Sequence, residues 1–197
     1  MPVTRSATAS ARRAQIVTAT IDVIADEGFG HATFARIAER AGLSSTRLIS
    51  YHFAGKDELV HAVVAHVFER IGRYMYERVA AAVDAPGRLR AYIEGNVEFI
   101  GTHRAEMKTL LDIVLAGGLP AEAAGDRTGE SHLAAILRQG QEAGHFRRFD
   151  PTVVATAVQR SIEGLPFLLA VEPDLDTAAY ARELVTLFEL GTRRDDA

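Results

Sequence analysis

Gly42 and the two short apolar patterns on either side of it constrain the fold more than any other part of the chain. In the first pattern the apolar residues recur at helical spacing, at Phe34, Ile37, Ala38 and Ala41. Glycine adopts the left-handed conformation that ends a helix without steric cost, so the first helix is expected to stop at Gly42. The segment 33–53 is therefore predicted to form two short helices around a glycine corner.

The second of these helices is predicted to be polar on one side. Thr33 is placed to cap the first helix, and Ser44 is placed to cap the second. Leu48 and Ile49 supply the inward face of the second helix. The side chains expected to face outward can bond bases and phosphates, and they are Ser45, Thr46, Arg47 and Ser50. From these residues alone, a DNA-binding helix pair and an ordinary helical hairpin are both open.

The flanking segments favour the DNA-binding alternative because they extend the hairpin to three helices. A preceding helix, expected to close at Gly28, has an apolar stripe made of Ile16, Ala19, Val23 and Ile24. Phe29 is expected to fold back against the hairpin. Downstream, residues 51–53 and Lys56 stand at the start of a further helix, whose free amide groups can hold a phosphate.

Taken together, these residues resemble the N-terminal domain of TetR-type transcriptional regulators. The matching positions are Thr33, Ile37, Ala38, Ala41, Gly42, Leu43, Ser44, Tyr51, His52, Phe53, Lys56, Asp57, Glu58 and Leu59. The family often carries a Gly-(Ala/Thr)-Leu-Tyr run in the second helix, and residues 47–50 replace it here. The resemblance implies a helix-turn-helix domain whose second helix enters the major groove of DNA.

The resemblance also implies an all-α fold with two domains. Residues 11–56 are expected to form the three-helix DNA-binding domain, and residues 57–197 a helical ligand-binding and dimerisation domain. Residues 1–10, rich in Ala, Ser and Thr, are expected to form a flexible arm, which Arg5, Arg12 and Arg13 could make a contact to the minor groove or to phosphates. The alternative, favoured for Arg5, is a solubilising tail. The predicted DNA-binding residues are Thr33, Ser44, Ser45, Thr46, Arg47, Ser50, Tyr51, His52 and Lys56.

The charge distribution agrees with an interface for DNA at one end of the chain. The whole chain has a net charge of −4, but residues 1–56 carry seven basic and four acidic side chains, a net charge of +3. There are no cysteines, so disulfides and thiolate metal sites are excluded. The longest uninterrupted apolar run, residues 165–171, is too short to span a bilayer, and a cytoplasmic protein without membrane contact is expected.

Helical patterns continue to the end of the chain. Helices are predicted at 57–83, 87–103, 105–116, 130–143, 151–171 and 176–193. A loop is predicted at 116–129, where breakers and small residues concentrate. Polar or large residues that interrupt the apolar pattern of these helices are candidates for a ligand pocket, namely Asn96, His103, Met107, Glu163 and Phe167. An asparagine satisfied within the core is the simpler interpretation of Asn96.

The last two predicted helices carry more apolar surface than one inward stripe requires. A two-fold pairing of these helices, which the resemblance also implies, would cover the excess. The residues predicted for this dimer interface are Val154, Val158, Ile162, Leu165, Leu184, Leu187 and Phe188. The alternative is that these faces bury against the central helices of the same chain.

The resemblance points to a homodimeric repressor that binds a double-stranded, palindromic operator and is released from it by a small molecule. No catalytic cluster, cofactor motif or metal-ligand spacing stands out, since His61 and His66 are five residues apart, so no enzyme activity, cofactor or metal is expected. An all-helical small-molecule-binding protein or enzyme without specific DNA binding is the alternative from another class. A transcriptional activator of the same fold is a third possibility.

Overall fold

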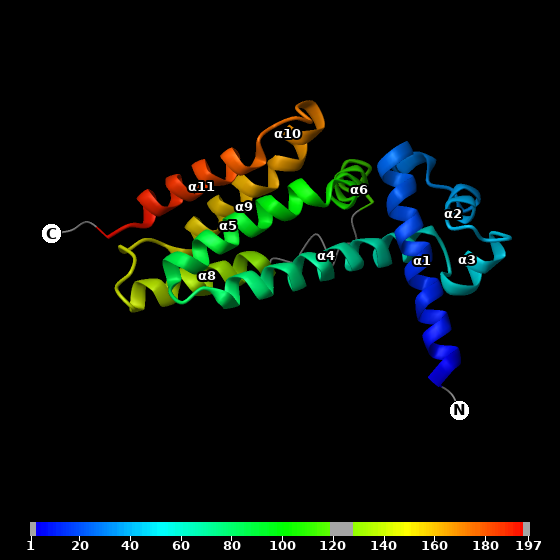
Figure 1. The fold of residues 1–197 in the computed structure, drawn as a ribbon, viewed down its shortest axis with the longest axis horizontal. Helices are drawn as coiled ribbons and strands as arrows, with labels where there is room; N and C mark the ends of the chain where they lie inside the picture. The colour runs from blue at the N-terminus through cyan, green and yellow to red at the C-terminus, as the bar shows by residue number, and fades with distance from the viewer. Residues whose placement is uncertain (1–2, 119–127, 195–197) are drawn as a thin grey trace. The chain divides into compact units, whose positions relative to one another are not determined.

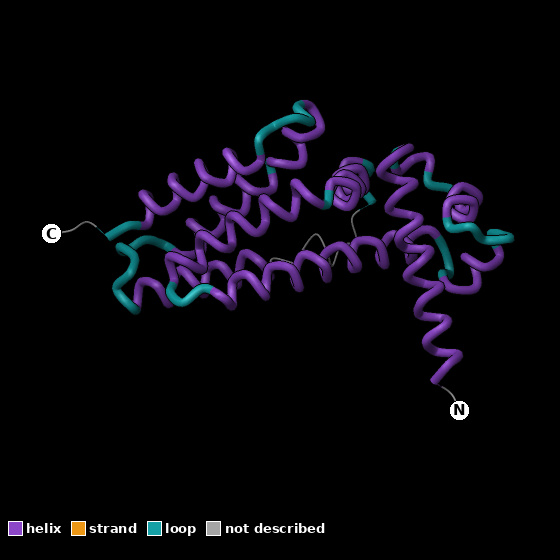
Figure 2. The backbone as a smooth tube through the Cα atoms, in the orientation of Figure 1, coloured by secondary structure: helices purple, strands orange, loops and turns teal. Residues whose placement is uncertain are grey.

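The computed structural model describes residues 3–118 and 128–194, and the regular elements within them are all helices (Figure 1; Figure 2). The predicted all-α fold class is thus confirmed. The chain divides into two compact units. Of the described residues, unit 1 contains 3–69 and 104–118, and unit 2 contains 70–103 and 128–194. The helix at 104–115 thus lies in unit 1, and the long helix at 56–81 contributes to both units.

Unit 1 holds the predicted helix-turn-helix. Its described elements are α1 (Val3–Glu27), η1 (Phe29–His31), α2 (Phe34–Arg40), α3 (Arg47–His52), α6 (Arg104–Leu115) and the first part of α4 (Lys56–Ala81). The packing partners of α1 within the unit are η1, α2, α3 and α6. One helix therefore organises the hairpin on which the candidate site lies.

The corner between α2 and α3 has the predicted conformation. Thr33 caps α2, since its hydroxyl accepts a hydrogen bond from the Arg36 amide at 3.4 Å. Gly42 has a φ of 63°, and the Leu43 amide donates to the Ala38 carbonyl at 2.8 Å. This is the Schellman arrangement, which satisfies carbonyls at a helix end and needs a residue with positive φ. The predicted corner at Gly42 is confirmed.

The core of unit 1 is apolar and includes two buried hydroxyls, those of Thr20 and Thr109. Ile49 of α3 and Phe53 after it are almost fully buried, as are Ile16, Ile24, Ile37, Leu59, Val63 and Ile113. Thr109 of α6 is also fully buried, and its hydroxyl donates to the Ile21 carbonyl of α1 at 3.1 Å. Lys108 donates to the Ala25 carbonyl. Both bonds fasten α6 to the last turns of α1.

The N-terminal arm is not observed within the described residues. Helix α1 begins at Val3, so helix replaces most of the flexible segment expected at 1–10. The physical reason lies in the same composition that suggested an arm, because alanine is the best helix former and serine and threonine are tolerated within a longer helix. An α1 of 25 residues also has its C-terminal half anchored in the core, which supports the exposed turns before it.

Unit 2 contains the remaining helices, with α5 at its centre. Its elements are the second part of α4, α5 (Ala85–Thr102), α8 (Thr128–Glu142), α9 (Pro151–Glu163), α10 (Leu165–Val171) and α11 (Thr177–Thr192). Helix α5 contacts α8, α9, α10 and α11. Gly140 of α8 lets the Phe146 ring pack directly against the helix backbone, since a Cβ at position 140 would collide with that ring.

Predicted and observed helix ends from α4 to α11 agree to within two residues, with one exception. The helix predicted at 151–171 is divided at Gly164 into α9 and α10. Pro166 explains the division, because proline fits the first turn of α10 but would remove a hydrogen bond from a continuous helix. The loop predicted at 116–129 lies largely outside the described residues.

The stretch Pro151–Val171 is more apolar over its length than the sequence analysis expects. By length and composition it could cross a membrane, with a mean hydropathy of 1.2 over a window that is 22% buried. It is, however, two helices that meet at Gly164, and four of its apolar side chains lie in the core of unit 2, namely Ala155, Val158, Ile162 and Leu165. The stretch is therefore weak evidence for a membrane span.

The conformation of Gly42 gives a stability prediction. No atom lies within 4 Å of a Cβ built at Gly42, so Gly42→Ala is opposed by the positive φ alone and is expected to lower the free energy of unfolding by about 1 kcal/mol. Urea denaturation followed by circular dichroism measures this. Gly30→Ala is the matched control, because that site is equally open but has no positive φ. Equal losses in both variants would contradict the argument.

Candidate nucleic-acid interface

The outer face of α3 carries the polar side chains that the sequence analysis predicts there. Ser45, Thr46, Arg47 and Ser50 are exposed, and Tyr51 is 82% exposed. The guanidinium of Arg47 has no hydrogen-bonding or charged partner among the described residues. Ile49 faces inward and is fully buried, while Leu48 is half-buried. The face thus presents one unpaired cation among hydroxyl groups, all of which can bond to DNA.

The predicted role of Ser44 as a helix cap is wrong. Helix α3 begins at Arg47, and its N-cap is Thr46, which makes no side-chain cap bond. The first turn is closed by the backbone, since the Ile49 amide donates to the Thr46 carbonyl at 3.0 Å. Ser44 lies outside the helix because the chain needs two more residues after Leu43 to turn from α2 into α3. Its hydroxyl is exposed.

Arg13 of α1 holds the C-terminal end of α3. Its guanidinium donates to the His52 carbonyl at 2.6 Å and to a carboxylate oxygen of Glu58 at 3.0 Å. It also lies over the Phe53 ring, 4.1 Å from the centroid. The carbonyls at a helix end lack partners within the helix, so a cation there satisfies one of them and complements the helix dipole. We call Arg13, His52, Phe53 and Glu58 the α3 clasp.

The clasp corrects one expectation. Arg13 was expected beside a DNA-contacting arm, but its guanidinium is occupied within unit 1. Glu58 is also held by the backbone, since the Ala54 amide donates to its second carboxylate oxygen at 2.7 Å. Phosphate binding by the amides in the first turn of α4 stays a prediction. The Ala54 amide, followed by Arg13, lowers the pKa of Glu58 from its usual value of 4.5. The pairing of Arg13 with Glu58 has no local signal in the sequence, because the two residues lie 45 positions apart.

Three other predicted DNA-binding residues of unit 1 also make contacts within the protein. Lys56 remains exposed, but its ammonium lies 4.5 Å from the centre of the Phe29 ring and donates to the Phe29 carbonyl at 3.3 Å. His52 is half-buried and stacks edge-on against Tyr51. The hydroxyl of Thr33 is engaged in the helix cap. These three side chains thus have structural contacts as well as solvent access.

The basic residues of α2 are paired with acidic residues at the end of α1. Arg40 forms an ion pair with Asp26 at 2.7 Å, and Arg36 forms one with Glu27. Both pairs are already included in the net charge of +3, since each joins one basic and one acidic side chain of residues 1–56. Arg36 and Arg40 are thus compensated by neighbouring carboxylates, whereas Arg47 is not.

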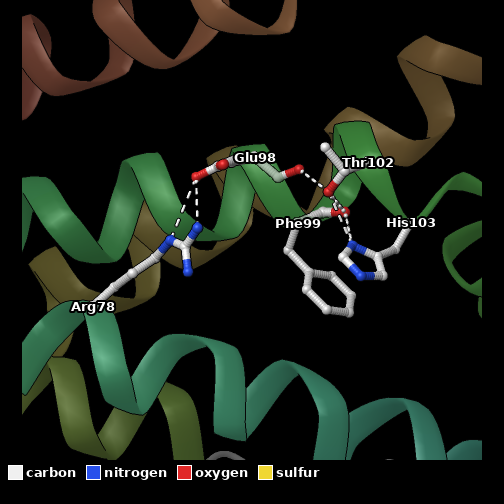
Figure 3. A network of polar contacts seen from close by, with 5 residues as sticks. All are labelled: Arg78, Glu98, Phe99, Thr102 and His103. Atoms are coloured by element: carbon white, nitrogen blue, oxygen red, sulfur yellow. Dashed lines mark hydrogen bonds and ion pairs between the residues drawn. The ribbon is translucent and has the colours of Figure 1, made fainter.

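The five candidate ligand residues are divided between the two units. Asn96 is half-buried in α5, and its amide donates to the Tyr92 carbonyl at 2.8 Å, as expected for a satisfied core asparagine. His103 is half-buried at the end of α5, where its ring stacks on Phe99 (Figure 3). Met107 lies on α6, in the other unit from Asn96 and His103.

Glu163 and Phe167 are exposed on unit 2, and their role in ligand binding stays a prediction. Glu163 accepts hydrogen bonds from Gln159 and Arg160 of its own helix. Phe167 is 50% exposed. Both residues flank the break at Gly164, which turns them outward while Ile162 and Leu165 face the core.

Part of the predicted dimer interface is buried within unit 2. Val158, Ile162 and Leu165 are at most 1% exposed, so they belong to the core of the unit and cannot lie on its surface. Leu187 is 60% exposed, and Val154, Leu184 and Phe188 are half-buried. Further large apolar side chains on the surface of α9, α10 and α11 are Val153, Phe167, Leu168, Val171 and Leu190.

Comparison with known proteins places the site in a class. Residues 16–63, which contain α2, the corner at Gly42 and α3, match the family model described as "Bacterial regulatory proteins, tetR family". The HTH-type transcriptional regulator BetI 1 of Chromohalobacter salexigens is 39% identical over 101 residues, which are 51% of this chain and 50% of that protein. The chain thus matches about half the length of these curated relatives.

Solved structures extend the likeness of fold to most of the chain. A transcriptional regulator from Saccharomonospora viridis, solved in complex with choline, has a TM-score of 0.83 and 21% identity, covering 94% of this chain and 99% of that one. AibR, solved with isovaleryl coenzyme A and operator DNA, has a TM-score of 0.74 and 20% identity, covering 89% and 97%.

The three-helix arrangement of α1, α2 and α3 with its exposed α3 face defines a helix-turn-helix domain. Residues 16–63 of this domain match the tetR family of bacterial regulatory proteins. The predicted resemblance of the N-terminal domain is thereby confirmed.

The α3 clasp gives a pH-dependent prediction. A carboxyl group whose pKa is lowered by folding adds stability above its unfolded pKa and loses it as the pH falls through the folded value. In a double-mutant cycle of Arg13→Met and Glu58→Gln, we therefore expect a stabilising coupling at pH 6 that becomes smaller as the pH falls below 4.5 and through the lowered pKa of folded Glu58. Urea midpoints of the four proteins across this pH range measure it. A coupling that does not decrease as the pH falls would show that the carboxylate charge is not involved.

Proposed function

We propose that this protein is a transcriptional regulator that binds an operator as a homodimer in the cytoplasm and represses transcription until a small molecule releases it. The observation that carries the proposal is the outer face of α3, where Arg47 is unpaired among Ser45, Thr46 and Ser50. The α3 clasp fixes this face, so little ordering is needed on binding DNA.

In this proposal α3 enters the major groove. Arginine can bond a guanine through two parallel hydrogen bonds, which is worth ~1–3 kcal/mol of discrimination against other bases. Arg47 is the residue best suited to this, because no group in the described part of the chain compensates its charge. Tyr51, His52 and Lys56 follow on the C-terminal side of the helix and would contact phosphates, which add affinity but carry no sequence information.

A homodimer is proposed because of the number of base pairs that a specific operator requires. One short helix contacts few base pairs, whereas two copies read two half-sites, spaced about 34–36 Å on one face of DNA. The exposed apolar residues of α9, α10 and α11 support a second copy as the partner for this surface of unit 2. Leu187 and Leu190 are both 60% exposed and lie on the last long helix.

Small-molecule release is proposed from the neighbours in fold. Choline and isovaleryl coenzyme A are the ligands named for two of them, so regulators of this architecture accept chemically different molecules. Helix α4 runs without interruption from unit 1 into unit 2. A ligand that biases α4 could therefore change operator affinity, and a coupling of ~1–3 kcal/mol would alter it roughly 5–150-fold.

The role of Arg47 can be tested on DNA. We expect Arg47→Ala to weaken binding to the operator by about tenfold or more, while binding to a scrambled duplex changes little, since a base contact is lost. Fluorescence anisotropy against DNA from upstream of the protein's own gene, or an operator obtained by in vitro selection, measures both affinities across a salt series. Arg138→Ala is the matched control, because it removes the same charge from an exposed position of α8.

An equal loss on both duplexes would assign Arg47 to phosphate contact. Salt-sensitive binding without preference for any selected sequence would instead favour the small-molecule-binding protein whose basic hairpin is incidental. A reporter gene placed behind the operator then decides between repression and activation.

The proposed dimer surface gives a separate prediction. Leu187→Asp is expected to shift the full-length protein from dimer to monomer at micromolar concentration, because a charge in an apolar interface costs more than the interface gains there. Sedimentation equilibrium measures the shift. Val83→Asp is the control, since Val83 is 96% exposed in the link between α4 and α5 and should leave the mass unchanged. A Leu187→Asp protein with the mass of the parent would remove this surface from the proposal.

A further inference from the structure

Three aromatic rings form a cluster between α4 and α5 in unit 2. The rings of Phe99 and His103 are stacked, with centroids 4.0 Å apart and an angle of 5° between the planes. Tyr74 meets both of them edge-on, at centroid distances of 5.3 Å and 6.0 Å. Figure 3 shows Phe99 and His103 on the side of α5 that faces α4.

A cation already occupies this cluster. The guanidinium of Arg78 lies 3.5 Å from the centre of the Tyr74 ring and 3.2 Å from the Glu98 carboxylate (Figure 3). An aromatic face on one side and a carboxylate on the other are the two groups that stabilise an organic cation in a binding site. Arg78 therefore marks a position where positive charge is favoured.

The position is open to solvent. The side chain of Glu98 is 54% exposed and that of Arg78 is 35% exposed, while Phe99 is buried and gives the cluster a fixed floor. Burial, followed by the hydrogen bond to the Glu98 carboxylate, raises the pKa of Tyr74 above its usual value. A ligand can thus reach the carboxylate and the ring without opening the core of unit 2.

We propose that this cluster binds a small organic cation of the quaternary ammonium class, which replaces the Arg78 guanidinium over Tyr74 and beside Glu98. A quaternary ammonium group has no N–H groups to satisfy, so aromatic contact and one carboxylate are enough to hold it. A phosphate or carboxylate ligand is disfavoured by Glu98. The inference rests on the proposed function, for which it names the ligand class.

The chain connects this site directly to unit 1. Tyr74 and Arg78 lie on α4, which leaves unit 1 one turn before Tyr74. His103 is the last residue of the α5 segment in unit 2, and Arg104 begins α6 in unit 1. Within unit 1, α6 is fastened to α1 through Thr109. Displacement of Arg78 therefore acts on both helices through which the cluster is joined to the DNA-binding unit.

Isothermal titration calorimetry of the full-length protein with choline chloride tests the site. The neutral isostere 3,3-dimethylbutan-1-ol, which has the same shape without the charge, is expected to bind about tenfold more weakly or not at all. Glu98→Gln and Tyr74→Leu should each weaken choline binding by about tenfold. Glu94→Gln is the matched control, because it removes an exposed carboxylate one turn earlier on α5 and should leave affinity unchanged.

Arg78→Met gives the sharpest readout because its effect has the opposite sign. Removal of the internal cation should tighten choline binding severalfold, whereas a purely structural Arg78 would leave it unchanged or weaken it. Thermal unfolding of each variant checks that it is folded. Absence of choline binding in both the parent and Arg78→Met, or binding that is indifferent to Glu98→Gln and Arg78→Met, would overturn the inference.

Operator binding measured without choline separates this inference from the proposed function. Specific DNA binding by a protein that binds no choline would remove the cation site and leave the regulator in place. Loss of choline binding in Glu98→Gln with operator affinity retained in the absence of ligand is the result expected if both proposals hold.

Discussion

The helix that presents the candidate DNA-binding face is too short to exist by itself. Helix α3 has six residues, and isolated helices of fewer than about 12–15 residues are marginal in water. Tertiary contacts therefore determine its position. Ile49 and Phe53 bury its inner side, and the α3 clasp satisfies a carbonyl at its C-terminal end. The exposed polar side chains of α3 have defined positions only because the opposite side of the helix is packed and hydrogen-bonded in this way.

The basic residues of the first segment divide into two groups by their environment. Arg13, Arg36 and Arg40 are paired with carboxylates inside unit 1, where they link α1 to the elements around it. Arg47 has no such partner among the described residues and projects from α3. Such pairs are partly exposed and contribute little to stability one by one, but they determine which cations remain free for a negatively charged partner.

The assignment of α6 to unit 1 gives the structure a physical route for regulation. Its buried Thr109 and its Lys108 bond to backbone carbonyls of α1, so α6 is held by directed bonds as well as by apolar packing. The aromatic cluster with Arg78 and Glu98 lies just before α6 in the chain and on α4, which both units share. A change of charge or contact in that cluster would thus be applied to two helices that enter the DNA-binding unit.

The sequence by itself determined the helices and the corner between α2 and α3, because apolar periodicity, the Thr33 cap and the left-handed Gly42 are local properties. It also predicted which residues of α3 face outward. Tertiary structure decided what is not local. The α3 clasp joins Arg13 to Glu58 across 45 positions, and α6 joins unit 1 through a bond between Thr109 and Ile21. The sequence pattern predicted a dimer surface at Val158, Ile162 and Leu165, but these side chains are buried in the core of unit 2. An apolar stripe does not reveal whether its own chain or a partner covers it.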